Sequence, residues 1–192
     1  MAFGYAFTWL KNGNVGAWEV NPVLGSMPQK VATALGELSE KLVGASYEPI
    51  AYLGKQQVNG QNYCVLAVQT IITKDPHKNI VLMKFNEKGM DCTLYSIEPL
   101  LEEGGAFGGL KIDPKVGKDI DVDALKTFES VTEGWLGMSI EPIALLATRV
   151  VKGVELTFLA KVVGVYPGAT PEVMMITVNG VTKTLDFEEV LA

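Results

Sequence analysis

The chain has 192 residues, of which 48% are hydrophobic and 20% are charged, and 16 Lys and Arg against 22 Asp and Glu leave a net charge of -6. This apolar content excludes a disordered chain, and the acidic balance argues against nucleic acid or an anionic membrane as partner. A soluble globular protein of one large domain or two small ones is expected.

The chain opens with an aromatic row in which Phe3, Tyr5, Phe7 and Trp9 alternate at a period of two. This pattern predicts a strand, followed by a turn at 11–14 and a return strand over 15–20. The first ten residues have neither the basic start nor the long apolar run of a signal peptide. We therefore predict a cytoplasmic protein, or a secreted one if a signal peptide has been trimmed.

Two amphipathic helices are predicted. The first starts with a capping-box pattern at Ser26 and ends at Gly44, and its apolar stripe comprises Val31, Leu35, Leu38 and Leu42. The second has Asp121 as its N-cap and ends before Gly137, and its stripe comprises Leu125, Phe128, Thr132 and Trp135. Such stripes are typical of helices that pack one face on a sheet.

Four strand-like runs follow each helix. They are 47–58, 62–73, 80–85 and 92–97 in the first half, and 140–151, 154–165, 173–178 and 182–187 in the second. Short connections make neighbouring strands antiparallel. Cys64 and Cys92 then lie two strand spacings apart, about 9–10 Å, which exceeds the ~7 Å that a disulfide allows between Cα atoms. Both thiols are predicted to be free.

The two halves are a duplication. Residues 44–69 and 137–162 align without a gap, and 11 of these 26 positions are identical, where unrelated sequences would share about two. We call residues 1–101, with the N-terminal aromatic strand, unit 1, and residues 102–192 unit 2. Each unit is predicted to be a helix packed across a four-stranded antiparallel meander, which is an α+β arrangement.

This order of elements, together with Gln56-Gln57-Val58-Asn59-Gly60 in the first hairpin and Asn62-Tyr63 after it, resembles the cystatin family. The resemblance implies a fold of two tandem cystatin-like units with an extra N-terminal strand hairpin. It also implies reversible, competitive inhibition of papain-like cysteine proteases, in which an N-terminal trunk and two hairpins form a wedge. The trunk glycine of the family maps near Gly16.

Within this resemblance, Val58 would supply an apolar contact, Gly60 would let the backbone turn tightly and approach the protease closely, and Gln56 would hold or extend the hairpin. The equivalent hairpin of unit 2 consists of Arg149, Val150, Val151, Lys152 and Gly153. Two other interpretations stay open. The hairpin can be a tight turn inherited with the fold, and the protein can be a scaffold that binds a protein or ligand through a sheet face.

Catalytic and metal-binding residues are not predicted. The single histidine, His77, follows Asp75-Pro76 in a turn, and no third group is available to orient a Cys-His or Ser-His pair. One histidine and two separated cysteines do not form a metal site. The glycine pairs at 104–105 and 108–109 do not follow the phosphate-loop pattern. We expect a non-catalytic protein without a cofactor, and the sequence leaves its oligomeric state open.

Overall fold

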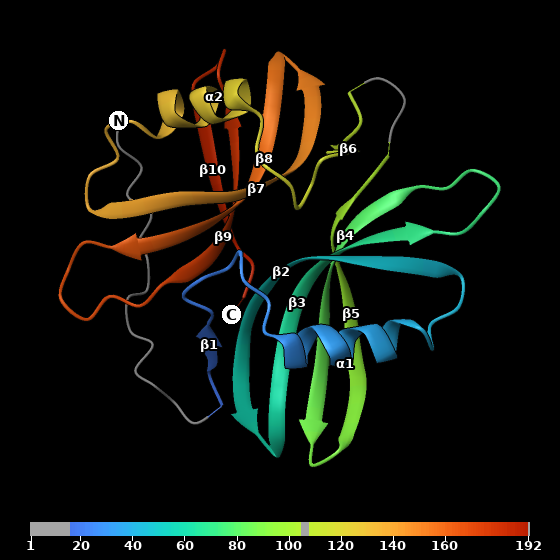
Figure 1. The fold of residues 1–192 in the computed structure, drawn as a ribbon. Coiled ribbons are helices and arrows are strands. Elements are labelled where there is room, and N and C mark those ends of the chain that lie inside the picture. Colours follow the sequence, from blue (N-terminus) through green and yellow to red (C-terminus); the bar gives the residue numbers. More distant parts are fainter. Residues whose placement is uncertain (1–15, 105–107, 192) are drawn as a thin grey trace.

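A computed structural model describes residues 16–104 and 108–191, and the protein is mostly β, with 53% of residues in strands and 13% in helices. Unit 1 contains β1 (Trp18–Val20), α1 (Gln29–Ser39), β2 (Ala45–Val58), β3 (Gly60–Ile71), β4 (Lys78–Lys88) and β5 (Asp91–Glu102). Unit 2 contains β6 (Lys111–Ile112), α2 (Val122–Thr132), β7 (Met138–Val151), β8 (Gly153–Gly164), β9 (Glu172–Asn179) and β10 (Thr184–Glu189). Each unit forms one antiparallel sheet, in the order β1-β2-β3-β4-β5 or β10-β9-β8-β7-β6 (Figure 1).

The fold class predicted from the sequence is wrong. A tandem cystatin-like α+β pair would have a helix across four strands in each unit and a separate N-terminal hairpin, whereas the protein is mostly β with two five-stranded sheets. The fifth strand of each sheet is a short edge strand. β1 pairs with β2 through Trp18 and Gln56, and β6 pairs with β7 through Lys111 and Thr148.

The physical reason lies in the long strands β2 and β7. Each would otherwise present an edge of unpaired N–H and C=O groups, and a short segment upstream of the helix covers part of that edge. Alternation along a sequence marks a strand but does not say which edge it joins. The predicted aromatic strand at residues 3–9 and the predicted turn at 11–14 lie outside the described residues.

The long strands carry the same irregularities in both units. Register shifts fall at Pro49/Ala51 and Tyr52/Gly54 in β2 and at the equivalent Pro142/Ala144 and Leu145/Ala147 in β7. Bulges of this kind bend a strand and increase its twist. Both strands curve strongly, which lets one end of each sheet turn toward the other unit (Figure 1).

The two helices match the prediction to different degrees. Asp121 is the N-cap of α2, as expected, and its Oδ1 accepts hydrogen bonds from the backbone N–H groups of Asp123 and Ala124 at 3.0 and 3.4 Å. The predicted cap of α1 is wrong, because the N-cap is Pro28 and the Ser26 hydroxyl donates to the Val23 carbonyl.

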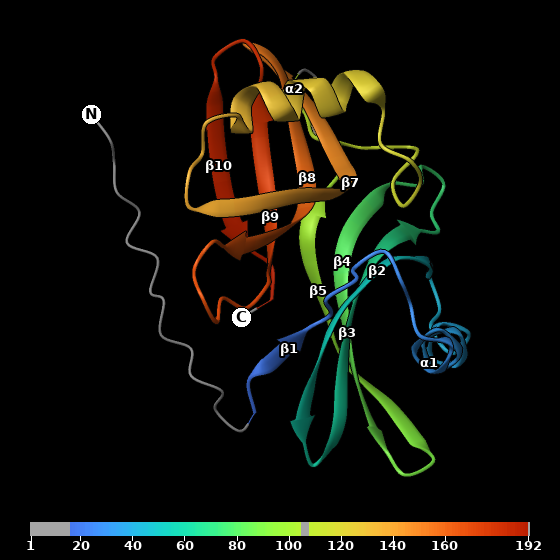
Figure 2. The ribbon, with the colours of Figure 1, turned by 60° about the vertical axis from the view of Figure 1, so that its left-hand side comes forward.

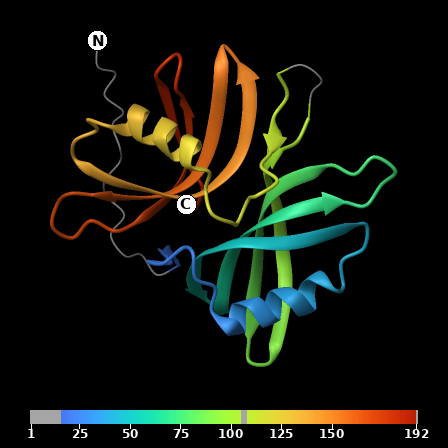
Figure 3. The same ribbon diagram turned by 45° about the horizontal axis from the view of Figure 1, so that its top comes forward.

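Three hydrophobic clusters fill the protein. One lies between α1 and its sheet, one lies between α2 and its sheet, and the third lies between the two sheets. Each helix lies across its own sheet (Figures 2 and 3). Because successive residues of a strand face opposite sides of the sheet, Tyr63 and Val65 contact the α1 side while Leu66 contacts the other sheet. The layers run α1, sheet, sheet, α2.

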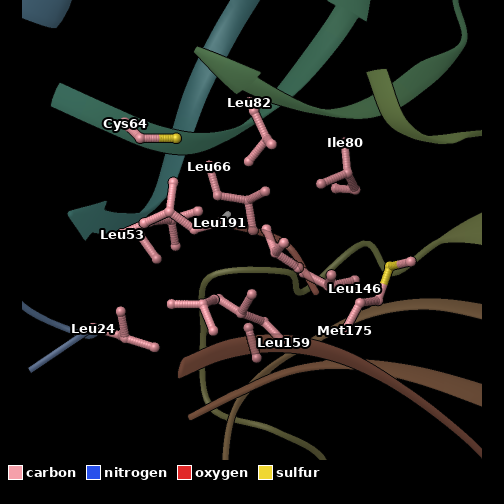
Figure 4. Packing of buried hydrophobic residues seen from close by; sticks show 14 of the residues in the cluster. Leu24, Leu53, Cys64, Leu66, Ile80, Leu82, Leu146, Leu159, Met175 and Leu191 are labelled. Atoms are coloured by element: carbon pink, nitrogen blue, oxygen red, sulfur yellow. The ribbon is translucent and has the colours of Figure 1, made fainter. Parts of the chain in front are cut away.

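We call the cluster between the sheets the shared core (Figure 4). It contains equivalent residues of both units in pairs: Ala51 and Ala144, Leu53 and Leu146, Leu66 and Leu159, Ile80 and Val173, and Leu82 and Met175. Cys64 also lies in it, whereas Cys92 packs against the α1 side of the sheet. Both thiols are free, as predicted.

Candidate functional site

The hairpin Gln56–Gly60 lies at the free end of unit 1, at the tip of β2 and β3 and beside the β4–β5 hairpin. This end points away from unit 2 (Figures 1 and 2). Each of the two hairpins presents one exposed apolar side chain: Val58 is 41% exposed, and Met90 in the β4–β5 turn is fully exposed. The two tips therefore form a small protruding surface with an apolar component, which we call the unit 1 tip.

Gln56 points along the sheet and not out of it. Its Nε2 donates to the Gly16 carbonyl at 2.6 Å, and its Oε1 accepts from Asn62 Nδ2 at 2.7 Å. Asn86 Nδ2 in turn donates to Asn62 Oδ1 at 2.7 Å. This amide ladder of Gln56, Asn62 and Asn86 crosses three strands and holds Gly16, near which the trunk glycine of the cystatin family maps, against the sheet.

Gly60 is required by the protein's own packing. Its φ is +105°, and a Cβ atom there would lie 2.4 Å from the Glu87 carbonyl oxygen of β4. The Gly60 carbonyl accepts a hydrogen bond from Gln57 Nε2 at 3.1 Å, and Asn86 Nδ2 reaches the Asn59 carbonyl at 3.4 Å. Of the five hairpin residues, Val58 is the one whose exposed apolar side chain is suited to contact a partner.

The equivalent hairpin of unit 2, Arg149–Gly153, keeps the turn but not the ladder. Arg149 replaces Gln56 and pairs with Glu155, with Nε donating to Oε2 at 2.8 Å. Asn179 Nδ2 donates to the Lys152 carbonyl at 3.1 Å, as Asn86 does for Asn59. Among the described residues, the large exposed apolar side chains at this end are those of Val150, Val151, Val154 and Val181.

Neither cysteine lies in a setting that would activate its thiol. Burial raises the pKa of the Cys64 thiol to about 12, and burial also raises the pKa of Cys92. A thiol with a raised pKa is a poor nucleophile at neutral pH. Within residues 16–104 and 108–191, no three His, Cys, Asp or Glu side chains are placed to hold a metal ion. Neither helix in that part of the chain has the length and hydrophobicity to cross a bilayer.

A pocket that the sequence did not indicate lies between the start of α1, the β1–α1 link and the helix side of β2 and β3. Its volume is about 320 Å³, and we call it the α1 pocket. Its lining comprises Glu19, Val20, Asn21, Pro22, Pro28, Lys30, Val31, Tyr52, Lys55 and Tyr63. Asn21 shapes the link, because its Nδ2 donates to the carbonyls of Val23 and Tyr52.

Ion pairs surround the α1 pocket. Lys30 Nζ lies 2.7 Å from Glu87 Oε2, which also accepts the Tyr63 hydroxyl at 3.0 Å, and Lys55 Nζ lies 3.4 Å from Glu19 Oε1. The hydrogen bond from Lys30 lowers the pKa of Glu87. Burial raises the pKa of Tyr52 to about 12, so this phenol stays protonated at neutral pH and can donate a hydrogen bond.

Comparison with known proteins assigns no class. The chain matches no protein-family model and no curated protein.

Proposed function

We propose that this protein is a non-catalytic binding protein that inserts the unit 1 tip into the cleft of another protein. The proposed target is a papain-like cysteine protease, which the protein would inhibit reversibly and competitively. The target class follows from the resemblance of Gln56–Gly60 to the cystatin motif.

The observation that carries the proposal is the exposure of Val58 and Met90 on two neighbouring hairpins at a free end of the protein. The backbone of a rigid turn loses little conformational entropy on binding, and apolar side chains that protrude from it gain by leaving water. The amide ladder and the packing of Gly60 hold the turn in one conformation before any partner arrives. The tip thus combines rigidity with accessible apolar surface.

The alternative, a scaffold that binds through a sheet face, has less support. One side of each sheet is packed against its helix and the other against the second sheet. A ligand on those faces would have to displace buried side chains. The aromatic row at residues 3–9, which this alternative also invokes, lies outside the described residues.

The test is an inhibition assay of papain with the full-length protein. Competitive inhibition is expected at micromolar concentration. Val58→Asp should weaken it by about tenfold or more, because a charge in place of an apolar anchor must be desolvated in the cleft. Val151→Asp is the matched control, since Val151 occupies the same place in unit 2 and is 44% exposed; it should leave inhibition unchanged.

Met90→Asp tests the second hairpin in the same assay and should also weaken inhibition. The substitutions Val58→Asp and Met90→Asp change exposed side chains, whereas changes at Gly60 would disturb the turn itself. Absence of inhibition at micromolar concentration, or equal losses for Val58→Asp and Val151→Asp, would overturn the proposal. Capture of another protein that depends on residues 3–9, and not on Val58, would favour the scaffold.

A further inference from the structure

The two helices differ in how their first turns are satisfied. The N–H groups in the first turn of a helix have no partner within the helix and carry partial positive charge. α2 supplies its own acceptor in Asp121 and places Asp123 in its first turn. α1 has Pro28 as its N-cap, with no side-chain cap and no acidic residue in its first turn. The start of α1 therefore has donors that no side chain neutralises, and it lines the α1 pocket.

A second observation in the same pocket is independent of the helix end. Tyr52 is 6% exposed, and within the described part of the chain its hydroxyl makes no hydrogen bond, although it lines the pocket. Fully buried polar groups are nearly always hydrogen-bonded. The Tyr52 hydroxyl is not among the fully buried unpaired atoms, so it is open to the pocket, where a ligand can accept its hydrogen bond. The neighbouring Tyr63 shows the ordinary behaviour, because its hydroxyl donates to Glu87.

Unit 2 has no counterpart of this set of groups. Tyr52 and Tyr63 correspond to Leu145 and Leu156, both buried against α2. Lys55 corresponds to Thr148, and Lys30 corresponds to Asp123. The same place in the duplicated fold is thus filled by ordinary apolar packing in unit 2. Tyrosines and lysines are not needed to build this layer, and their presence in unit 1 calls for another role.

We propose that the α1 pocket binds a small monocarboxylate with an apolar body. The carboxylate would accept hydrogen bonds from the Tyr52 hydroxyl and from the first N–H groups of α1, where anions bind favourably. The Lys30 ammonium has three donors and can serve the ligand while it keeps its pair with Glu87. The apolar body would pack on Val31 and on the tyrosine rings. About 320 Å³ is at the small end of the range for ligand pockets.

The test is an NMR titration of the full-length, ¹⁵N-labelled protein with phenylacetate. Saturable shifts are expected at the backbone amides of Gln29, Lys30 and Val31. Phenylacetamide, which has the same body without the charge, should not saturate these shifts. Tyr52→Phe should weaken phenylacetate binding about tenfold, the cost of losing a hydrogen bond to a charged group. Tyr95→Phe is the control, because Tyr95 is 50% exposed on β5 and does not line the pocket.

No saturable shift in the unmodified protein, an equal response to phenylacetamide, or unchanged affinity in Tyr52→Phe would each overturn the proposal. The amide spectrum of Tyr52→Phe reports whether that variant is folded. If it is not folded, Lys30→Met takes its place. Unchanged phenylacetate affinity in Lys30→Met would likewise overturn the proposal. Neither Val58 nor Met90 lines the pocket, so this test and the papain assay can fail independently.

Discussion

The two units are built on one apolar pattern and differ in their polar groups. In the helix-side clusters, Val65 and Phe158, Val81 and Met174, and Met83 and Ile176 occupy equivalent buried positions. The polar positions differ, since Tyr52, Tyr63 and Lys55 of unit 1 are Leu145, Leu156 and Thr148 in unit 2. What both units keep serves folding, and what unit 1 alone has is the better guide to function.

The base of the hairpin shows the same division. Gln56 and Asn62 of unit 1 are replaced by Arg149 and Glu155, so an amide contact becomes an ion pair. The asparagine of the next strand is kept in both units, and it donates to the turn in both. The support of the turn is thus common to the two units, while the bonds across the strands are not.

The largest expected effect on stability comes from substitutions in the shared core. Leu53 and Leu146 are equivalent and fully buried, and replacing either by Ala should lower the free energy of unfolding by about 3 kcal/mol. Urea denaturation would measure both. One cooperative transition is expected in each variant, because both leucines belong to one cluster. Two transitions, of which a single one shifts, would show that the units unfold separately.

A smaller difference is expected between the two turn glycines. Gly60→Ala should cost about 2–3 kcal/mol, because the new Cβ meets a backbone oxygen that cannot move away. Gly153→Ala should cost about 1–2 kcal/mol, since its Cβ would meet Cγ2 and Cβ of Val181, 2.8 and 2.9 Å away, in an exposed turn that can shift more easily than a paired strand. Thermal unfolding of the two variants compares them, and equal costs would contradict this account.

The hairpin base should respond more weakly. Gln56→Ala leaves the buried Asn62 without one of its partners and should cost about 1–2 kcal/mol. Arg149→Ala breaks a pair whose arginine side chain is 46% exposed, and should cost less than about 1 kcal/mol. Chemical denaturation at low and high salt distinguishes the two variants. Salt should reduce the loss of stability in Arg149→Ala, which removes an ion pair, and should not change the loss in Gln56→Ala. The reverse salt dependence would contradict the description of one hairpin base as an amide contact and the other as an ion pair.

The smallest effect concerns pH. The hydrogen bond from Lys30 lowers the folded-state pKa of Glu87 below its ordinary value of 4.5. The Lys30–Glu87 pair therefore stabilises the folded state fully above pH 4.5, and this stabilisation is lost as the pH falls through the lowered pKa of Glu87. Lys30→Met should raise the pKa of Glu87, which a ¹³C titration of its carboxyl group would follow. Unit 2 has Gly180 in place of Glu87, so no matching titration is expected there.

Much of the strand pattern could be predicted because it depends on local alternation. Strand β2 ends at Val58 as expected, although β3 starts at Gly60 and not at residue 62, and Asp121 caps α2 as expected. The edge strands could not be placed, because a three-residue segment such as Trp18–Val20 has too few positions to set a register by itself. Ser26 has the sequence of a cap, but its hydroxyl is used by the preceding turn.

The candidate site was predicted less well than the fold elements. The motif located the unit 1 tip and implied that Gln56 holds the hairpin and that Gly60 approaches a protease, but it did not identify their partners within the chain. Those partners, Gly16, Asn62 and Glu87, are brought near by sheet register, which the motif does not contain. The α1 pocket was missed because its residues are scattered along the chain. The available signal was the pair of tyrosines aligned with two leucines.

The shared core has a consequence for the history of the chain. Equivalent residues of the two units meet there, so the face that each sheet presents is complementary to a copy of itself, as in a two-fold symmetric dimer. A single ancestral unit with that face would have been driven to pair with a second copy to keep it from water. Duplication and fusion would then have converted a homodimer into one chain and released its halves to diverge.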